Sequence, residues 1–193
     1  MAADAKPPTS ARRAELLAAS VAYVAEHGLA ELSLRPLAQA IGSSPRVLLY
    51  LFGAKEGLIR EILDVGRAEQ LALVERADGH RGTARQTLDL LWTWLIAPER
   101  RGALRLFFDG YVRSFDSPEG PWSDFAGKSL NDWLPPLRRV LADHPVPPTL
   151  VLAVLRGLLL DHLAATTRDH HERVQSAWTS FLDHSFPPPD TPG

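Results

Sequence analysis

The feature that most constrains the fold is a short apolar segment enclosed by helix-breaking residues. Gly42 and Gly53 bracket it, and it opens with Ser44 followed by Pro45. Serine caps the free amides at a helix start, and proline fits the first turn because it has no amide to leave unpaired. The pattern predicts a helix over 45–52, too short to be stable unless it packs on its neighbours.

The rest of the chain also has a helical pattern. Alternating runs of β-branched and aromatic residues are missing, whereas Leu, Ala, Arg and Glu recur at helical spacing. We therefore predict an all-α fold. The predicted helices span residues 10–27, 34–42, 45–52, 54–74, 83–97, 99–115, 122–142, 148–166 and 168–184.

Composition excludes several classes of protein. The 193 residues include no cysteine, so a disulfide framework or a thiolate metal site is impossible. No apolar run reaches the length of a membrane span, and the N-terminus lacks an apolar targeting region, so we expect a cytoplasmic protein without membrane contact. Residues 1–65 carry seven basic and seven acidic side chains. Any binding to nucleic acid must therefore depend on where the charges lie.

The helix over 45–52 and the helix before it match a helix-turn-helix. Two helices joined by a tight turn with glycine, the second one short, are typical of a motif whose second helix enters the DNA major groove. The apolar positions fit this arrangement, because three residues of the first helix can pack against two of the second. These residues are Leu37, Ala38 and Ile41 on one side and Leu48 and Phe52 on the other.

Packing in this register leaves Arg46, Leu49 and Tyr50 on the outward face of the short helix. Arg46 can donate two hydrogen bonds to guanine, and Leu49 and the Pro45 ring can contact thymine methyl groups. Other side chains are expected to contact the DNA backbone. Phosphate contacts are expected from Ser33, Ser44, Tyr50 and Lys55, and Arg35 is expected to reach a base edge or the backbone.

Two alternatives remain open for these residues. The helix-turn-helix shape also occurs as plain packing in helical proteins. A helical protein-interaction module that has lost DNA binding would use its exposed leucines as partner contacts instead. In that case Leu49 and Tyr50 would belong to a protein interface or a core, and Arg46 would simply be solvated.

Residues 14–63 resemble the DNA-binding domain of the tetracycline-repressor (TetR) family of bacterial regulators. The match lies in ELLAASVAYVAEHGLAELSLRPLAQAIGSSPRVLLYLFGAKEGLIREIL, with its Leu-Ala-x-x-Ile-Gly run and its Lys-Glu pair. The resemblance implies operator contacts by Arg35, Ser44, Pro45, Arg46 and Tyr50, and a phosphate contact by Lys55. The chain departs from the family where two residues that usually contact phosphate are replaced by leucines, at positions 49 and 51.

The resemblance also implies a homodimer that binds double-stranded operator DNA and is released by a small apolar effector. We divide the chain into a flexible arm (1–9), an N-terminal three-helix helix-turn-helix DNA-binding domain (10–65), a C-terminal helical effector-binding and dimerisation domain (66–186) and a Pro-rich tail (187–193). The expected dimer interface residues are Leu152, Leu155, Leu159, Val174, Trp178 and Leu182. Packing of these residues inside their own subunit is the alternative.

All five tryptophans lie in the predicted effector domain, where aromatic residues can line an apolar cavity. The expected pocket residues are Trp92, Phe108, Tyr111, Phe115, Trp133 and His162. For each aromatic residue, packing in the core is the competing interpretation. Repression that the effector relieves is the expected mode of action, through a shift between two conformations.

No enzyme signature is present: the sequence has no P-loop, no G-x-G-x-x-G, no G-x-S-x-G and no H-E-x-x-H. We therefore expect no catalytic residue and no cofactor. The histidine-rich stretch from Asp161 to His171 is interpreted as a solvated connector with no metal bound, because His170 and His171 fall at a predicted turn and no cysteine is available.

Overall fold

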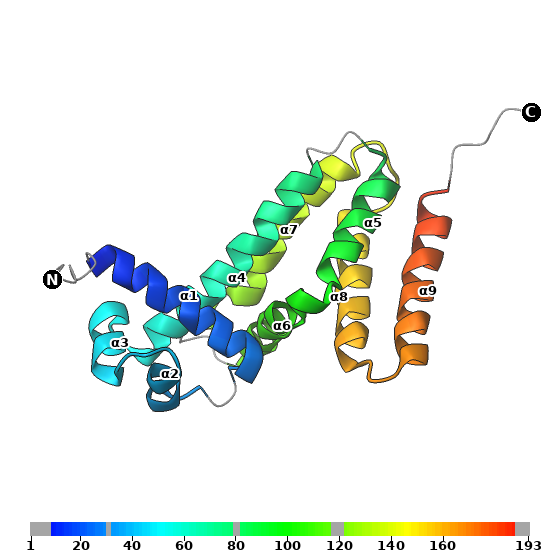
Figure 1. Cartoon of the computed structure of the whole chain (residues 1–193). Helices are drawn as coiled ribbons and strands as arrows, with labels where there is room; N and C mark the ends of the chain where they lie inside the picture. Colours follow the sequence, from blue (N-terminus) through cyan, green and yellow to red (C-terminus); the bar gives the residue numbers. More distant parts are fainter. Residues whose placement is uncertain (1–8, 30–31, 79–81, 117–121, 188–193) are drawn as a thin grey trace, which may run out of the picture. The chain divides into compact units, whose positions relative to one another are not determined.

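The computed structural model describes residues 9–29, 32–78, 82–116 and 122–187, and every long regular element among them is an α-helix (Figure 1). The predicted all-α fold is confirmed. The helices are α1 (Thr9–His27), α2 (Leu34–Ala40), α3 (Pro45–Phe52), α4 (Lys55–Asp78), α5 (Ala84–Leu95), the 3₁₀ turn η1 (Pro98–Arg100), α6 (Arg101–Asp116), α7 (Phe125–Val140), α8 (Pro148–Ala164) and α9 (Arg168–Ser185).

Two predicted segments fall almost entirely outside the described residues. Of the arm at 1–9 only Thr9 is described, as the first residue of α1, and of the tail at 187–193 only Pro187 is described. Within the described residues, no helix is both long enough and apolar enough to cross a membrane.

The helices group into two compact units, and the chain passes between them three times. Unit 1 comprises Met1–Ala68 and Gly102–Ala126, and unit 2 comprises Glu69–Arg101 and Gly127–Gly193. The sequence analysis divided the helical part of the chain once, between residues 65 and 66. The structure instead groups α6 with the N-terminal helices.

Close helix packing explains why α6 belongs to unit 1. A Cβ atom on Gly102 would lie 2.6 Å from the carbonyl oxygen of Ala25, so the start of α6 rests against the backbone of α1. Further along α6, the Phe107 ring lies 5.7 Å from the ring of Phe125. Only glycine allows the first of these contacts, because any side chain would force the two helices apart.

The core of unit 1 combines apolar residues of the first four helices with Leu104, Phe107 and Phe108 of α6. The first four helices turn one apolar stripe inward, as their 3.6-residue periodicity predicts. The buried residues include Leu16 and Val24 of α1, Leu37 and Ala38 of α2, Leu48 and Phe52 of α3, and Leu58 and Ile62 of α4.

Unit 2 is organised around two stacked tryptophans that join α5 to α9. The rings of Trp92 and Trp178 are 5.0 Å apart, and both are almost fully buried. Each indole N–H has an acceptor, because Trp92 donates to Gln175 at 2.7 Å and Trp178 donates to Asp89 at 3.1 Å. A buried indole that keeps its hydrogen bond loses little on desolvation, so the pair fixes α9 against α5. Helix α8 runs antiparallel beside α9 (Figure 1).

Candidate functional site

Helix α3 begins and ends where the sequence predicts. The hydroxyl oxygen of Ser44 accepts a hydrogen bond from the Val47 amide at 3.2 Å, and Pro45 is the first helical residue. The flanking residues Gly42 and Gly53 have φ of 62° and 77°, a left-handed conformation that suits glycine. The short helix is thus fixed at both ends by its own sequence.

The predicted packing of α2 against α3 is also confirmed. Leu37 and Ala38 of α2 are fully buried, as is Leu48 of α3, and Phe52 is nearly so. Ile41 is only half-buried, since it caps the C-terminal end of α2 rather than lying on the inner face.

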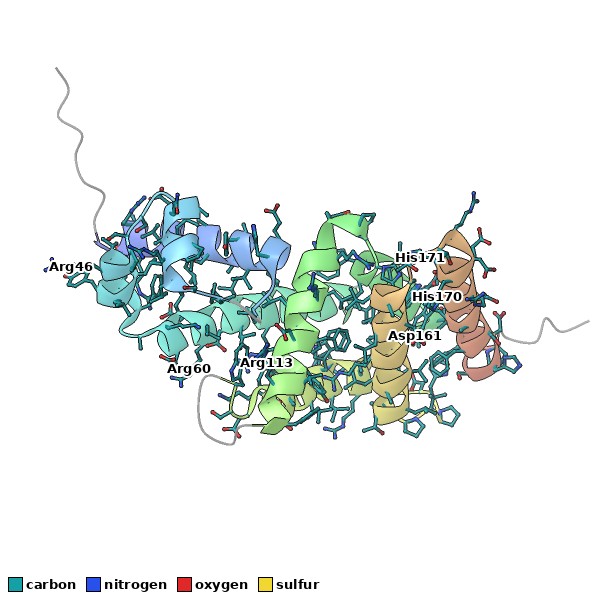
Figure 2. All side chains as sticks on the ribbon, turned by 90° about the horizontal axis from the view of Figure 1, so that it is seen from below. Arg46, Arg60, Arg113, Asp161, His170 and His171 are labelled. Atoms are coloured by element: carbon teal, nitrogen blue, oxygen red, sulfur yellow. The ribbon has the colours of Figure 1, made fainter. Side chains whose placement is uncertain are left out.

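The opposite face of α3 is open to solvent. Tyr50 is 79% exposed, Leu49 is 42% exposed, and Arg46 is also exposed. In Figure 2 the Arg46 side chain extends outward from α3, away from the body of unit 1. Half-buried Pro45 adjoins this face at the first turn. Burial of the inner stripe therefore leaves free the outward residues that the sequence analysis named.

Ser33 differs from expectation in one respect. It stands at the N-cap of α2, but its side chain makes no capping hydrogen bond. The third residue of α2 is Pro36, which has no amide to donate, so the hydroxyl lacks one of its usual partners. Arg35, the second residue of α2, is exposed. Lys55, the first residue of α4, is half-buried.

The charge around α2 and α3 is positive, although unit 1 as a whole has nearly equal numbers of acids and bases. Residues 32–55 contain two arginines and one lysine and not a single acidic residue. Two acidic residues on other helices are paired: Glu15 with Arg12 at 2.9 Å, and Glu61 with Arg13. The region around α2 and α3 is thus locally positive, although the net charge of unit 1 is close to zero.

Arg13 makes contacts with α3 that the sequence analysis did not anticipate. Its Nε donates to the carbonyl oxygen of Leu51 at 3.3 Å, and its guanidinium pairs with Glu61 of α4. The same guanidinium lies 5.2 Å from the centre of the Phe52 ring. One side chain of α1 therefore holds the last turn of α3, whose carbonyls have no partner within the helix. A doublet of arginines at a helix start carries no signal of this role in a single sequence.

The six expected pocket residues are divided between the two units. Phe108, Tyr111 and Phe115 lie on α6 in unit 1, where Phe115 is 65% exposed and Phe108 is buried. Trp133 is buried in unit 2. Two residues, Trp92 and His162, do line one cavity of about 570 Å³ within unit 2. Aromatic composition cannot distinguish residues of a cavity wall from residues of a core.

The histidine-rich stretch contains the connection between α8 and α9, but His170 and His171 lie in the first turn of α9 and not at the predicted turn. His162 lies in the last turn of α8 and His171 in the first turn of α9, and their rings are 5.0 Å apart. Burial, followed by the nearby charges of His171 and Arg101, lowers the pKa of His162 below 6.5. Within the described residues, the structure brings together no group of three or more metal-ligating side chains.

The six expected dimer residues pack inside their own unit, which is the alternative that the sequence left open. All are buried with at most 5% exposure; they are Leu152, Leu155, Leu159, Val174, Trp178 and Leu182. On the other side of α8, Leu150 and Leu160 are nearly half exposed. A helix that is apolar nearly all round gives no indication of which stripe faces its own subunit.

Comparison with known families finds a match to part of the N-terminal segment. Residues 16–62 match the model of the family described as bacterial regulatory proteins, tetR family. The matched range begins in α1, includes all of α2 and α3, and ends in α4. A sequence comparison with curated proteins finds no match.

Solved structures share the fold over nearly the whole chain. A transcriptional regulator from Rhodococcus sp. Rha1 is 23% identical, with a TM-score of 0.76 over 90% of this chain and 95% of that one. A TetR family transcription regulator from Marinobacter aquaeolei VT8 is 21% identical, with a TM-score of 0.60 over 89% and 95% of the two chains. The multidrug binding protein EbrR, solved with imidazole, is 21% identical, with a TM-score of 0.65 over 96% and 94%.

Proposed function

Because residues 16–62 match the model of the tetR family of bacterial regulatory proteins, we propose that the protein is a DNA-binding transcriptional regulator. It binds a palindromic operator as a homodimer, acts as a repressor, and is released by a small-molecule effector. The observation that carries the proposal is the exposed face of α3, where Arg46, Leu49 and Tyr50 stand free on a helix fixed at both ends.

The chemistry of this face suits the major groove. Arg46 has the fork of donors that matches the O6 and N7 atoms of guanine, and Leu49 offers an apolar surface to a thymine methyl. Tyr50, Lys55 and Ser33 supply hydrogen-bond donors for phosphates at the edges of the groove. The absence of acidic residues from 32 to 55 removes the repulsion that would oppose such contacts.

Binding to a fragment of the protein's own promoter tests the proposal. Phosphate neutralisation predicts that the logarithm of the association constant falls linearly with the logarithm of the salt concentration. Fluorescence anisotropy at several salt concentrations measures this slope. A protein that binds the fragment no better than unrelated DNA, or without salt dependence, is not an operator-binding regulator.

Two substitutions separate base reading from phosphate contact. Arg46→Ala should cost about 1 to 3 kcal/mol on the native operator and relax the preference at one base pair. Lys55→Ala should weaken binding to all sequences alike and reduce the salt slope by about one per subunit. If Arg46→Ala weakened binding to all sequences alike while Lys55→Ala relaxed the preference at one base pair, or if neither variant changed DNA binding, the assignment of these residues would be contradicted.

The dimer is proposed to form through the outward side of the α8–α9 hairpin rather than through the six buried residues. Leu150 and Leu160 are large apolar side chains on the exposed face of α8, and Ala153 and Gly157 between them permit close approach. A single recognition helix binds weakly, while two at a spacing of about 34 to 36 Å read a palindrome. Analytical ultracentrifugation of Leu150→Glu/Leu160→Glu should show monomers where the unchanged protein forms dimers.

A protein-interaction module is the alternative, and the partial exposure of Val47 and Leu49 favours it. Such a module would not respond to salt as a DNA-binding protein does. For the effector, the comparison with EbrR motivates a search for small ligands, because that protein is described as multidrug binding. A ligand that binds the folded protein raises its melting temperature, so a thermal-shift screen identifies candidates.

A further inference from the structure

The cavity within unit 2 has an apolar floor. It measures about 570 Å³, within the range of small-molecule sites. Three elements surround it: α5, the end of α8 and the start of α9. The floor consists of Trp92, Ile96 and Val174, and both Trp92 and Val174 are otherwise buried. A flat aromatic or aliphatic body can pack on such a surface and gain by leaving water.

The rim of the cavity is polar and rich in hydrogen-bond donors. His162 and His171 face each other across the α8–α9 turn, with their rings 5.0 Å apart. The turn between them contributes Thr166 and Thr167, and Thr167 uses its hydroxyl oxygen to cap α9 through the His170 amide. In Figure 2 the labelled His171 lies at this end of the helical hairpin.

The charged and titratable groups around this rim are two imidazoles, one ion pair and a neighbouring arginine. His162 is on α8, Arg101 is at the start of α6, and Arg168, His171 and Glu172 are on α9, whereas α5 contributes only uncharged residues to the lining. Arg101 donates to the carbonyl oxygen of His162 at 3.3 Å. Arg168 and Glu172 pair with each other at 2.8 Å, so the charge of each is largely balanced by the other.

We propose that this cavity binds a small carboxylate with an apolar or aromatic body. The body lies on Trp92, Ile96 and Val174, and the carboxylate accepts hydrogen bonds from the imidazoles of His162 and His171. A carboxylate fits better than a phosphate, because the rim offers two single donors at its centre and no cluster of backbone amides. Binding stands on this geometry alone, while a role as effector rests on the proposed function.

Protonation follows from the same arrangement. Desolvation and the charges of His171 and Arg101 lower the pKa of His162, so its imidazole is mostly neutral at neutral pH. A carboxylate beside it opposes the charge effect and favours the protonated ring. The affinity for the carboxylate should therefore increase as the pH falls from 8 to 6.

The experiment uses 3-phenylpropanoate as the probe and 3-phenylpropanamide, its neutral analogue, as the control ligand. Trp92 lines the cavity, so quenching of tryptophan fluorescence reports occupancy, and calorimetry confirms it. We expect the carboxylate to bind about tenfold more tightly than the amide at pH 6, because charged hydrogen bonds are the stronger ones. At pH 8, the ratio of carboxylate affinity to amide affinity should be about threefold or more smaller than at pH 6.

Variants locate the site. His162→Asn and His171→Asn should each weaken carboxylate binding by about fivefold or more while leaving the weak binding of the amide unchanged. His184→Asn, an exposed histidine of α9 outside the cavity, is the matched control and should bind as the unchanged protein does. If His162→Asn does not fold, His171→Asn decides the question alone, because its ring lies in the first turn of α9.

Three results would overturn the inference: no carboxylate binding at pH 6, equal binding of amide and carboxylate, or unchanged affinity in the two cavity variants. The proposed function is tested separately by adding promoter DNA. Carboxylate binding without any change in DNA affinity would remove the effector role but keep the site. Intact DNA binding with no carboxylate bound would remove the site but keep the regulator.

Discussion

Replacing Arg13 by glutamine should reduce DNA affinity although the side chain touches no DNA in the proposed complex. Its guanidinium holds the carbonyl of Leu51 and pairs with Glu61, so it fixes the last turn of α3 to α1 and α4. Without it, α3 keeps the packing of Leu48 and Phe52 but loses its tie to α1 and α4. The recognition residues would then sample more orientations before they dock.

The magnitude can be worked out from the contacts. The Arg13 and Glu61 side chains are 42% and 28% exposed, so their pair contributes only about 0.5 to 1 kcal/mol. The 3.3 Å hydrogen bond to Leu51 adds about 0.5 to 1 kcal/mol. The contact with the Phe52 ring adds about 0.5 kcal/mol. Together these hold α3 with about 2 kcal/mol, and losing most of that should weaken operator binding about tenfold.

The assay is the same anisotropy titration, repeated from 50 to 200 mM salt. Arg13→Gln should bind more weakly at every salt concentration, with an unchanged slope, because a positioning residue neutralises no phosphate. Arg173→Gln, which removes an exposed arginine paired with Asp169 on α9, is the matched control and should leave both quantities unchanged. Circular dichroism checks that each variant is folded at the assay temperature.

Two outcomes would refute this reasoning. Unchanged affinity would mean that packing alone positions α3. A slope reduced by about one per subunit would mean that Arg13 contacts a phosphate directly. A double-mutant cycle with Glu61→Gln adds a second check, because residues that act through one contact are not additive.

Three further predictions concern stability. Leu48→Ala should destabilise the protein by about 2 to 5 kcal/mol in urea unfolding, since it empties a fully buried site. Gly102→Ala should cost about 1 to 3 kcal/mol because its Cβ would clash with α1, whereas Gly127→Ala, in open space on α7, should gain about 0.5 to 1 kcal/mol. Burial and positive neighbours lower the pKa of His162, so the unfolded chain takes up its proton more readily and stability falls as the pH drops below 6.5. The difference between the melting temperatures at pH 7.5 and pH 5.5 should therefore be smaller in His162→Asn than in the unchanged protein.

Local chemistry made α3 predictable from the sequence. Ser44, Pro45 and Gly53 specify where this helix begins and ends, and the apolar spacing specifies which side is buried. These signals act over a few residues and do not depend on the rest of the fold. The exposed positions of Arg46 and Tyr50 follow directly from them.

Contacts between distant segments were not predictable in the same way. The bond from Arg13 to Leu51 joins residues 38 apart, and the clash that Gly102 avoids involves Ala25. Neither contact produces a periodic pattern in the sequence. Helix α8 presents a related difficulty, because an apolar residue such as Leu155 inside the unit and one such as Leu160 outside it look alike.

The membership of α6 in unit 1 has a consequence for any fragment made from the N-terminal helices. A cut after Ala68 would leave α1 and Leu63 of α4 without the helix whose glycines, Gly102 and Gly110, lie against them. A fragment that keeps unit 1 whole is therefore discontinuous in sequence, because it needs residues from both stretches, 1–68 and 102–126.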